Sequence, residues 1–339
     1  MDEQYFIETI QNTDTVIFES LRGSRLFIDF LKRQPKGEKW KIISDYVLGD
    51  KNKNNDVMTF TIYSGKVGEP IQRELDEIAE AMPRDLKDVR GGISNEAISM
   101  LQDRNIFSIS ILFDKRPFRN IQKEHANKII EWLVKYAGKV ISNNGDVAHA
   151  RNILRYAQRS KAKGFNVQLF LYTLVLASVV SALACHISAE CNPKAIEWFS
   201  DRDDMVIHGN EVGFSLLHLV YFKLGCNLGY VPHFFVSIGI VCDDEAGNGG
   251  LWFDALIRIP DYISGVVASA PFENGRIGPM KDKFKDGMNA FCSDSKNIIF
   301  YMLKFTPVPK DMAIIVTPYT VEITDVPRLG YEVDRNFDA

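Results

Sequence analysis

The sequence predicts an α/β protein with a mixed sheet covered by helices. The first third of the chain contains three runs rich in β-branched and aromatic residues: 40–48, 57–63 and 107–113. Two helical patterns follow, at 121–137 and 147–161. A strand-like run at 195–200, a helical pattern at 211–224 and a second strand-like run at 233–241 come after them. Consecutive strands followed by alternating helices and strands are typical of one sheet that packs helices on its faces.

The N-terminal part of the chain is predicted to be helical. Apolar residues recur at helical spacing from Phe6 to Phe30, and the turn residues of 34–37 end the pattern. The runs 40–48 and 57–63 flank a polar segment, 49–55, which predicts a β-hairpin. We therefore expect an N-terminal helical segment over residues 1–39 that leads directly into the first strand.

Residues that favour the start or the end of a helix recur in the rest of the chain. The segment 68–82 carries Pro70 near its first turn, and the segment 94–102 begins at Ser94, which is a favourable capping residue. Gly225 is expected to end the helix over 211–224. No repeat or low-complexity linker divides the chain, so we expect one elaborated α/β domain over 40–270. The remaining residues, 271–339, are expected to form a C-terminal extension with short strands.

One apolar segment allows two interpretations. Residues 164–189 contain no Asp, Glu, Lys or Arg, and the length meets the criterion for a membrane-spanning helix. Polar residues interrupt the segment, and strand-like and helical patterns lie on both sides of it. This pattern favours a buried central helix, with membrane attachment through residues 165–187 as the alternative.

Composition narrows the class of protein. The net charge of −4 gives no global signal for nucleic acid, so such a partner would need a local basic patch or metal ions. Five scattered cysteines without a CxxC pair indicate reduced thiols, and the acidic start lacks the pattern of a secretory signal, so we expect a cytoplasmic protein. Nucleophile-elbow, Walker and dinucleotide-binding motifs are missing from the sequence.

Aspartates stand where a buried or β-rich environment disfavours them. Asp45 lies in the first strand run, and Asp201, Asp203 and Asp204 follow the fourth. Asp254 and Asp261 lie in the apolar stretch 251–268, with Pro260 between them. Because proline disrupts a helix interior, we expect a helix that starts near Pro260, with Asp254 as a cap before it.

These residues resemble the RNase H-like nuclease superfamily. The stretches ISDYVLGDKNKNNDVMTFTIY (43–63) and LIRIPDYISGVV (256–267) are similar, more narrowly, to a family of uncharacterised bacterial and phage proteins. The resemblance implies three antiparallel strands followed by parallel strands with helices. It also implies a catalytic set made of Asp45, of Asp201 (or Asp203 or Asp204) and of Asp261. Apart from the resemblance, Asp254 is a further candidate metal ligand, with the role of a helix cap as its alternative.

Converging carboxylates repel one another unless cations neutralise them. Mg²⁺ and Mn²⁺ prefer oxygen ligands, and two such ions can activate a water and stabilise the leaving oxygen of a phosphodiester. We therefore expect a metal-dependent nuclease that acts on DNA or RNA. Ordinary structural roles are the alternatives: a salt bridge or an edge position for Asp45, a pairing with Arg258 for Asp261, and a solvated loop for 201–204. The corresponding functional alternative is a non-catalytic interaction protein that keeps the fold.

A basic stripe is predicted on one helix. Its members recur every four residues, so they share a helical face: Arg151, Arg155, Arg159 and Lys163. The stripe is either a solvated face or a ridge that binds nucleic-acid phosphates without reading sequence.

Overall fold

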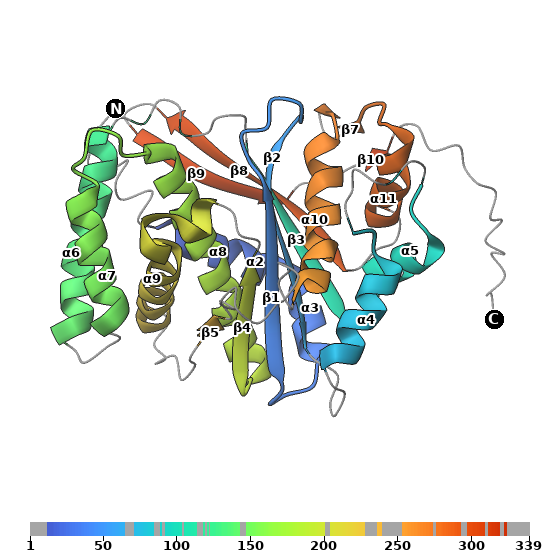
Figure 1. Cartoon of the computed structure of the whole chain (residues 1–339), viewed down its shortest axis with the longest axis horizontal. Coiled ribbons are helices and arrows are strands. Elements are labelled where there is room, and N and C mark those ends of the chain that lie inside the picture. The colour runs from blue at the N-terminus through green and yellow to red at the C-terminus, as the bar shows by residue number, and fades with distance from the viewer. Residues whose placement is uncertain are drawn as a thin grey trace, which may run out of the picture.

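The protein is an α/β protein with a seven-stranded mixed sheet, seen in a computed structural model (Figure 1). The residues that the structure describes are 12–64, 71–84, 89, 92–103, 105–113, 118, 121, 123–142, 147–200, 204–227, 236–238, 253–273, 276–292, 297–308, 311–318 and 322–323. The strand order is β5-β4-β1-β2-β3-β8-β9, so β1 lies in the interior of the sheet.

Both strand directions occur in this sheet. Its strands are β1 (Lys39–Val47), β2 (Asp56–Ser64), β3 (Ile106–Phe113), β4 (Ala195–Ser200), β5 (Val236–Ile238), β8 (Ile298–Val308) and β9 (Asp311–Pro318). The pairs β1–β2, β2–β3 and β8–β9 are antiparallel, whereas β1–β4, β4–β5 and β3–β8 are parallel. The predicted hairpin and three-strand start are confirmed. A second, small sheet contains β6 (Phe272–Glu273), β7 (Arg276–Ile277) and β10 (Glu322–Ile323).

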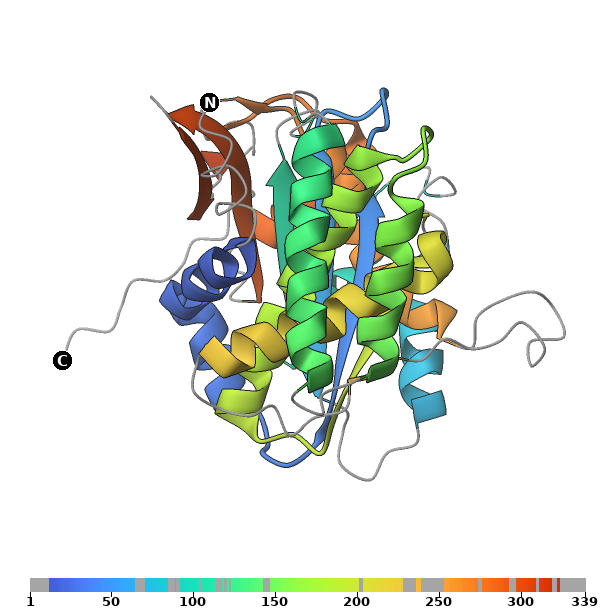
Figure 2. The same cartoon turned by 90° about the vertical axis from the view of Figure 1, so that its left-hand side faces the viewer.

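Helices cover both faces of the large sheet (Figures 1 and 2). On one side lie α2 (Thr13–Gly23), α3 (Arg25–Arg33), α6 (Lys123–Ser142), α7 (Val147–Arg159), α8 (Val167–Cys191) and α9 (Asp204–Asn227). On the other lie α4 (Ile71–Ala81), α5 (Asn95–Leu101), α10 (Asp254–Ser269) and α11 (Asp282–Cys292). Each side has its own hydrophobic core, and β-strand alternation sends successive residues into one core or the other.

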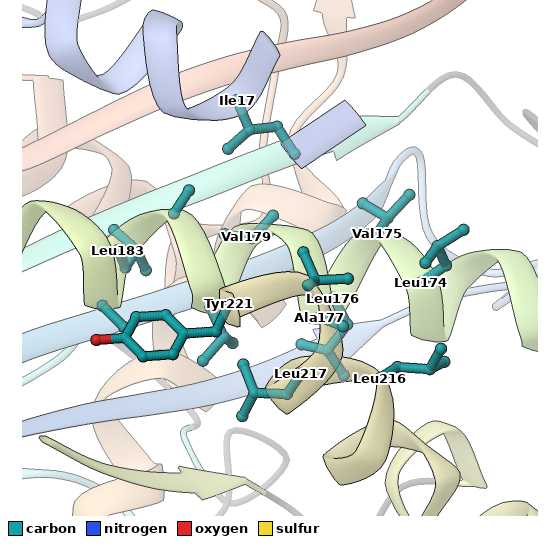
Figure 3. Close-up of a cluster of buried hydrophobic side chains, with 14 of the residues drawn as sticks. Ile17, Leu174, Val175, Leu176, Ala177, Val179, Leu183, Leu216, Leu217 and Tyr221 are labelled. Carbon is teal, nitrogen blue, oxygen red and sulfur yellow. The ribbon is translucent and has the colours of Figure 1, made fainter. Parts of the chain in front are cut away.

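Helix α8 is a buried central helix. It packs between α2, α9 and the sheet, and its apolar side chains meet Leu216, Leu217 and Tyr221 of α9 (Figure 3). Asn166 caps its N-terminus through Oδ1, which accepts from the Leu169 amide. Among the described residues, α8 is the one helix long and apolar enough to cross a membrane, and 78% of its most apolar window is buried. Length and composition do not separate a core helix from a membrane span, so membrane attachment remains a prediction.

Several elements differ from the sequence expectation. Helix α9 begins at Asp204 rather than near 211, and the described part of the fifth strand covers Val236–Ile238 of the predicted 233–241. Strand β8 was not predicted, yet it pairs with β3 and extends the main sheet. The C-terminal extension therefore contributes two strands to the same sheet as the first 270 residues.

His186 of α8 gives the fold a pH dependence. Its ring stacks on Phe18 at 4.0 Å, and its Nε2–H donates to the Phe18 carbonyl at 2.9 Å. Burial lowers the pKa of His186 to about 4 from 6.5. Between pH 6.5 and pH 4, the His186 imidazole is protonated in the unfolded chain but stays neutral in the folded chain. The free energy of unfolding should therefore fall between pH 6.5 and pH 4, by roughly 3 kcal/mol at most from this residue.

Urea unfolding of His186→Gln, which keeps a donor for the Phe18 carbonyl, isolates that contribution. The stability advantage of the wild type over the variant should shrink as the pH falls from 7 to 4. A constant difference across this range would show that His186 titrates alike in the folded and unfolded chains.

Candidate functional site at Asp45 and helix α10

Asp45 lies in the sheet interior, near the C-terminal end of β1. Its side chain is only 5% exposed and faces α10, where its Oδ2 accepts a hydrogen bond from the Ser264 hydroxyl. Because β1 lies between β4 and β2, Asp45 does not occupy the edge position that was one of its structural alternatives. A carboxylate is therefore held in the interior against the last helix of the α/β part of the chain, with a hydroxyl as a partner.

A row of buried hydroxyls continues from Asp45 across the sheet. The register pairs Asp45 with Thr59 of β2, and Thr59 with Ser110 of β3. The Thr59 and Ser110 hydroxyls lie 3.0 Å apart, and both side chains are fully buried. The side of the sheet beneath α10 is thus polar beside Asp45, although its surroundings are an apolar core.

Helix α10 begins earlier than predicted. It starts at Asp254 and continues through Pro260, so the proline is inside the helix and not at its start. The residue before the helix, Phe253, is its N-cap, and Asp254 is an exposed residue of the first turn. Asp254 is therefore not the cap that the sequence suggested.

Pairing of Arg258 with Asp261 was the structural alternative to a metal site, and the structure gives Arg258 another role. Its Nη1 donates to the carbonyls of Ala79 and Met82 at 2.9 and 3.3 Å, at the C-terminal end of α4. The guanidinium thus supplies hydrogen-bond donors to carbonyls that a helix end leaves without intrahelical partners. Arg258 ties α10 to α4.

Asp261 lies on α10, one turn before Ser264, and is half-buried. The Ser264 Oγ is 3.0 Å from the Asp261 main-chain carbonyl and also contacts the Asp45 carboxylate. A hydroxyl carries one hydrogen, and a charged acceptor makes the stronger bond, so an ionised Asp45 is the favoured acceptor. Ser264 therefore links the Asp45 carboxylate of the sheet to the turn of α10 whose main chain includes Asp261.

The β1–β2 hairpin holds the C-terminal end of α10. The amides of Asn54 and Asn55 both donate to the Ala268 carbonyl, at 2.8 and 3.0 Å. The Asn55 side-chain amide donates to the carbonyls of Val267 and Ala270, at 3.1 and 2.6 Å. These bonds satisfy carbonyls that the last turn of a helix leaves free. The hairpin thereby fixes α10, and with it Asp261, relative to β1.

Asn55→Ala should loosen this attachment. The substitution removes two side-chain hydrogen bonds to helix carbonyls and leaves the backbone bonds, so we expect a loss of about 1–3 kcal/mol in unfolding free energy. Asn52→Ala, at an exposed position of the same hairpin, is the control. Urea unfolding gives the free energies, and hydrogen exchange at the end of α10 should be faster only in Asn55→Ala. Equal behaviour of the two variants would contradict the role of Asn55.

Asp56, at the base of the same hairpin, is a structural carboxylate. Its Oδ1 accepts from the Gly49 amide at 2.8 Å, and its Oδ2 accepts from the Tyr172 hydroxyl of α8 at 3.0 Å. Burial, together with the Asp56 charge, raises the pKa of Tyr172. The hairpin is thus tied to helices on both sides of the sheet.

Lys53 is a site residue that the sequence did not indicate. Its Nζ donates to the Ser269 hydroxyl at 2.8 Å and reaches the Gly265 carbonyl at 3.4 Å. Gly265 follows Asp261 by one helical turn, so the ammonium lies beside the acidic site. Burial lowers the pKa of Lys53, while Asp50 and Asp261 act in the opposite direction.

The third predicted acid belongs to the 201–204 segment, most of which lies outside the described residues. Asp201 and Asp203 lie outside the described residues, and Asp204 begins α9 with a side chain that is not described. Strand β4 ends at Ser200, which pairs with Ser44, the residue before Asp45. Within the described ranges, no group of three or more His, Cys, Asp or Glu side chains could hold a metal ion.

The predicted basic stripe lies on the other side of the sheet. Arg151, Arg155 and Arg159 are exposed on α7, and Lys163 is exposed just beyond its end. Helix α7 belongs to the outer layer on the α8 side, whereas α10 covers the opposite face (Figures 1 and 2). The stripe therefore does not adjoin Asp45 or Asp261.

Comparison of the chain with protein-family models, with curated proteins and with solved structures gives no match.

Proposed function

We propose that the chain is a divalent-metal-dependent phosphodiester hydrolase built on an RNase H-like core. Asp45, Asp261 and one acid of the 201–204 segment, most directly Asp201, would be the metal ligands. The observation that carries this proposal is the meeting of β1 and α10, where Ser264 links the Asp45 carboxylate to the turn that bears Asp261.

The arrangement of strands and helices supports the RNase H-like assignment. Strands β3, β2, β1, β4 and β5 are neighbours in that order, the first three antiparallel and the next two parallel to β1. Helices α8 and α9 cover one face and α10 covers the other. This is the arrangement that the resemblance implies, with β8 and β9 as additions beyond β3.

The donor chemistry of the site fits Mg²⁺ or Mn²⁺ in part. Two carboxylates come from facing elements, and hard divalent cations prefer such oxygen ligands. When bound, the ions would supply activation of water and charge stabilisation at the leaving oxygen. The protein would hold the carboxylates in position: Ser264 orients Asp45, and the hairpin fixes α10 at the end beyond Asp261.

A non-catalytic interaction protein with the same fold is the second candidate. The buried Asp45 carboxylate accepts a hydrogen bond from Ser264. This observation favours the non-catalytic protein, because a hydrogen-bonded buried carboxylate also serves a purely structural role. DNA or RNA as the partner and the cytoplasm as the compartment remain predictions under both proposals.

A cleavage assay separates the two candidates. End-labelled single-stranded DNA, duplex DNA and RNA are incubated with the purified chain and Mn²⁺ or Mg²⁺, and in parallel with EDTA. The chain is expected to hydrolyse the substrates in the samples with metal and not in those with EDTA. This activity should be lost when Asp45 or Asp261 is replaced. Intact substrates, or cleavage that survives both replacements, would reject the hydrolase in favour of the interaction protein or of a contaminating nuclease.

A further inference from the structure

Three lysines from distant parts of the sequence lie at one border of the Asp45–α10 site. Lys53 belongs to the β1–β2 hairpin, Lys281 immediately precedes α11, and Lys283 lies in the first turn of α11. Figure 1 shows α11 beside α10, on the side of the sheet that carries Asp45. We call these three residues the lysine edge.

The ring of Phe284 brings two of these ammonium groups together. Lys53 Nζ lies 5.2 Å from the ring centroid, and Lys283 Nζ lies 5.1 Å from it. Both distances are within the range of a cation–π interaction, and the ring itself is buried. Two positive charges are thus gathered around one aromatic side chain.

The charges of the lysine edge act on one another. Burial is the first cause that lowers the pKa of Lys53, and the nearby Lys283 and Lys281 lower it further, whereas Asp50 and Asp261 raise it. Like charges held close together repel, and a bound anion relieves that repulsion. Lysine ammonium groups bind phosphate as point charges.

The lysine edge is held at a defined place relative to the acids. Lys53 is hydrogen-bonded to the last two turns of α10, at Gly265 and Ser269. Helix α11 approaches α10 closely at Gly287, where an added methyl group would collide with the ring and hydroxyl of Tyr262. Because Lys53 contacts Gly265, four residues after Asp261, the lysine edge begins about one helical turn beyond Asp261.

We propose that Lys53, Lys281 and Lys283 bind backbone phosphates of a single nucleic-acid strand and hold it beside Asp45 and Asp261. This inference rests on the proposed function, for which it supplies the substrate-binding surface. An acidic site repels a polyanion, so a strand that reaches Asp45 needs cationic groups close by. Such contacts position the strand without reading its sequence.

Fluorescence anisotropy tests the proposal with a labelled oligothymidylate longer than a typical single-strand site of roughly 4–16 nucleotides. The buffer contains EDTA, so that neither metal binding nor cleavage contributes. Lys281→Gln/Lys283→Gln should weaken binding about tenfold. It should also reduce the slope of log affinity against log salt by about 1.4, because a single-strand phosphate contact contributes roughly 0.7.

The matched control removes two positive charges from the opposite side of the sheet. Arg151→Gln/Arg155→Gln on α7 should bind the oligomer within about twofold of the wild type and with an unchanged salt slope. A single charge reversal at the exposed Lys281, Lys281→Glu, should weaken binding in the same direction as the double variant. Circular dichroism and thermal unfolding confirm that each variant is folded.

Several results would overturn the lysine edge. They are equal losses in the two double variants, a loss confined to the α7 variant, or failure of the wild-type chain to bind the oligomer. The proposed function fails separately: binding that depends on Lys281 and Lys283, without any metal-dependent cleavage, would retain the surface and reject the hydrolase. Cleavage that depends on Asp45, with normal binding by the lysine variant, would retain the hydrolase and reject the surface.

Discussion

Asp45→Asn is expected to abolish metal-dependent cleavage and leave the fold intact. Asparagine has nearly the same shape and still accepts the Ser264 hydroxyl, but it lacks the negative charge that a divalent cation requires. A bound metal contributes several kcal/mol to stabilisation of the transition state, so we expect at least a 100-fold loss of cleavage rate. Removal of a buried charge should at the same time leave the unfolding free energy unchanged or raise it.

The opposite directions of these two effects make the experiment specific. Asp261→Asn should lose cleavage to a similar extent, whereas Asp254→Asn should retain it, since Asp254 is exposed at the start of the same helix. Rates are measured at saturating Mn²⁺ and again over a Mn²⁺ titration, because a lost ligand raises the concentration of metal required. Asp45→Asn with full activity, or with a large loss of stability, would assign this carboxylate a structural role.

The position of Asp45 could be predicted from the sequence, but its partner could not. An aspartate in a β-rich run is unfavourable, and this alone indicated that Asp45 serves a purpose. Ser264 gave no such signal, because a small residue in an apolar helix is ordinary. Lys53, Lys281 and Lys283 were missed for a related reason: their proximity depends on how the hairpin and α11 pack against α10, which spacing along the chain does not reveal.

Proline was given too much weight in the expectation for α10. In α10, Pro260 removes one backbone hydrogen bond, while Ile257 and Ile259 on the preceding turn are buried, so packing retains the helix through the proline.

Lys223→Met is expected to cause the largest loss of stability of any single substitution considered for this chain. Lys223 Nζ of α9 donates to both carboxylate oxygens of Asp14 in α2, at 2.8 and 3.1 Å, and also lies 5.3 Å from the Trp132 ring centroid in α6. The two side chains are only 10% and 3% exposed. Loss of the ammonium leaves a buried carboxylate without its counter-charge, which costs about 3–5 kcal/mol.

The double variant Asp14→Leu/Lys223→Met should recover most of this loss, because removal of both charges also removes the cost of burying them. The exposed pair of Arg22 and Glu19, with side chains 64% and 43% exposed, provides the contrast: Arg22→Met should change the unfolding free energy by less than about 1 kcal/mol. Urea unfolding of the wild type, Asp14→Leu, Lys223→Met and the double variant forms a double-mutant cycle, and Arg22→Met is measured beside it. If the double variant is as unstable as Lys223→Met, the charges are not the cause, and the loss comes from the packing of the Lys223 stem against Trp132.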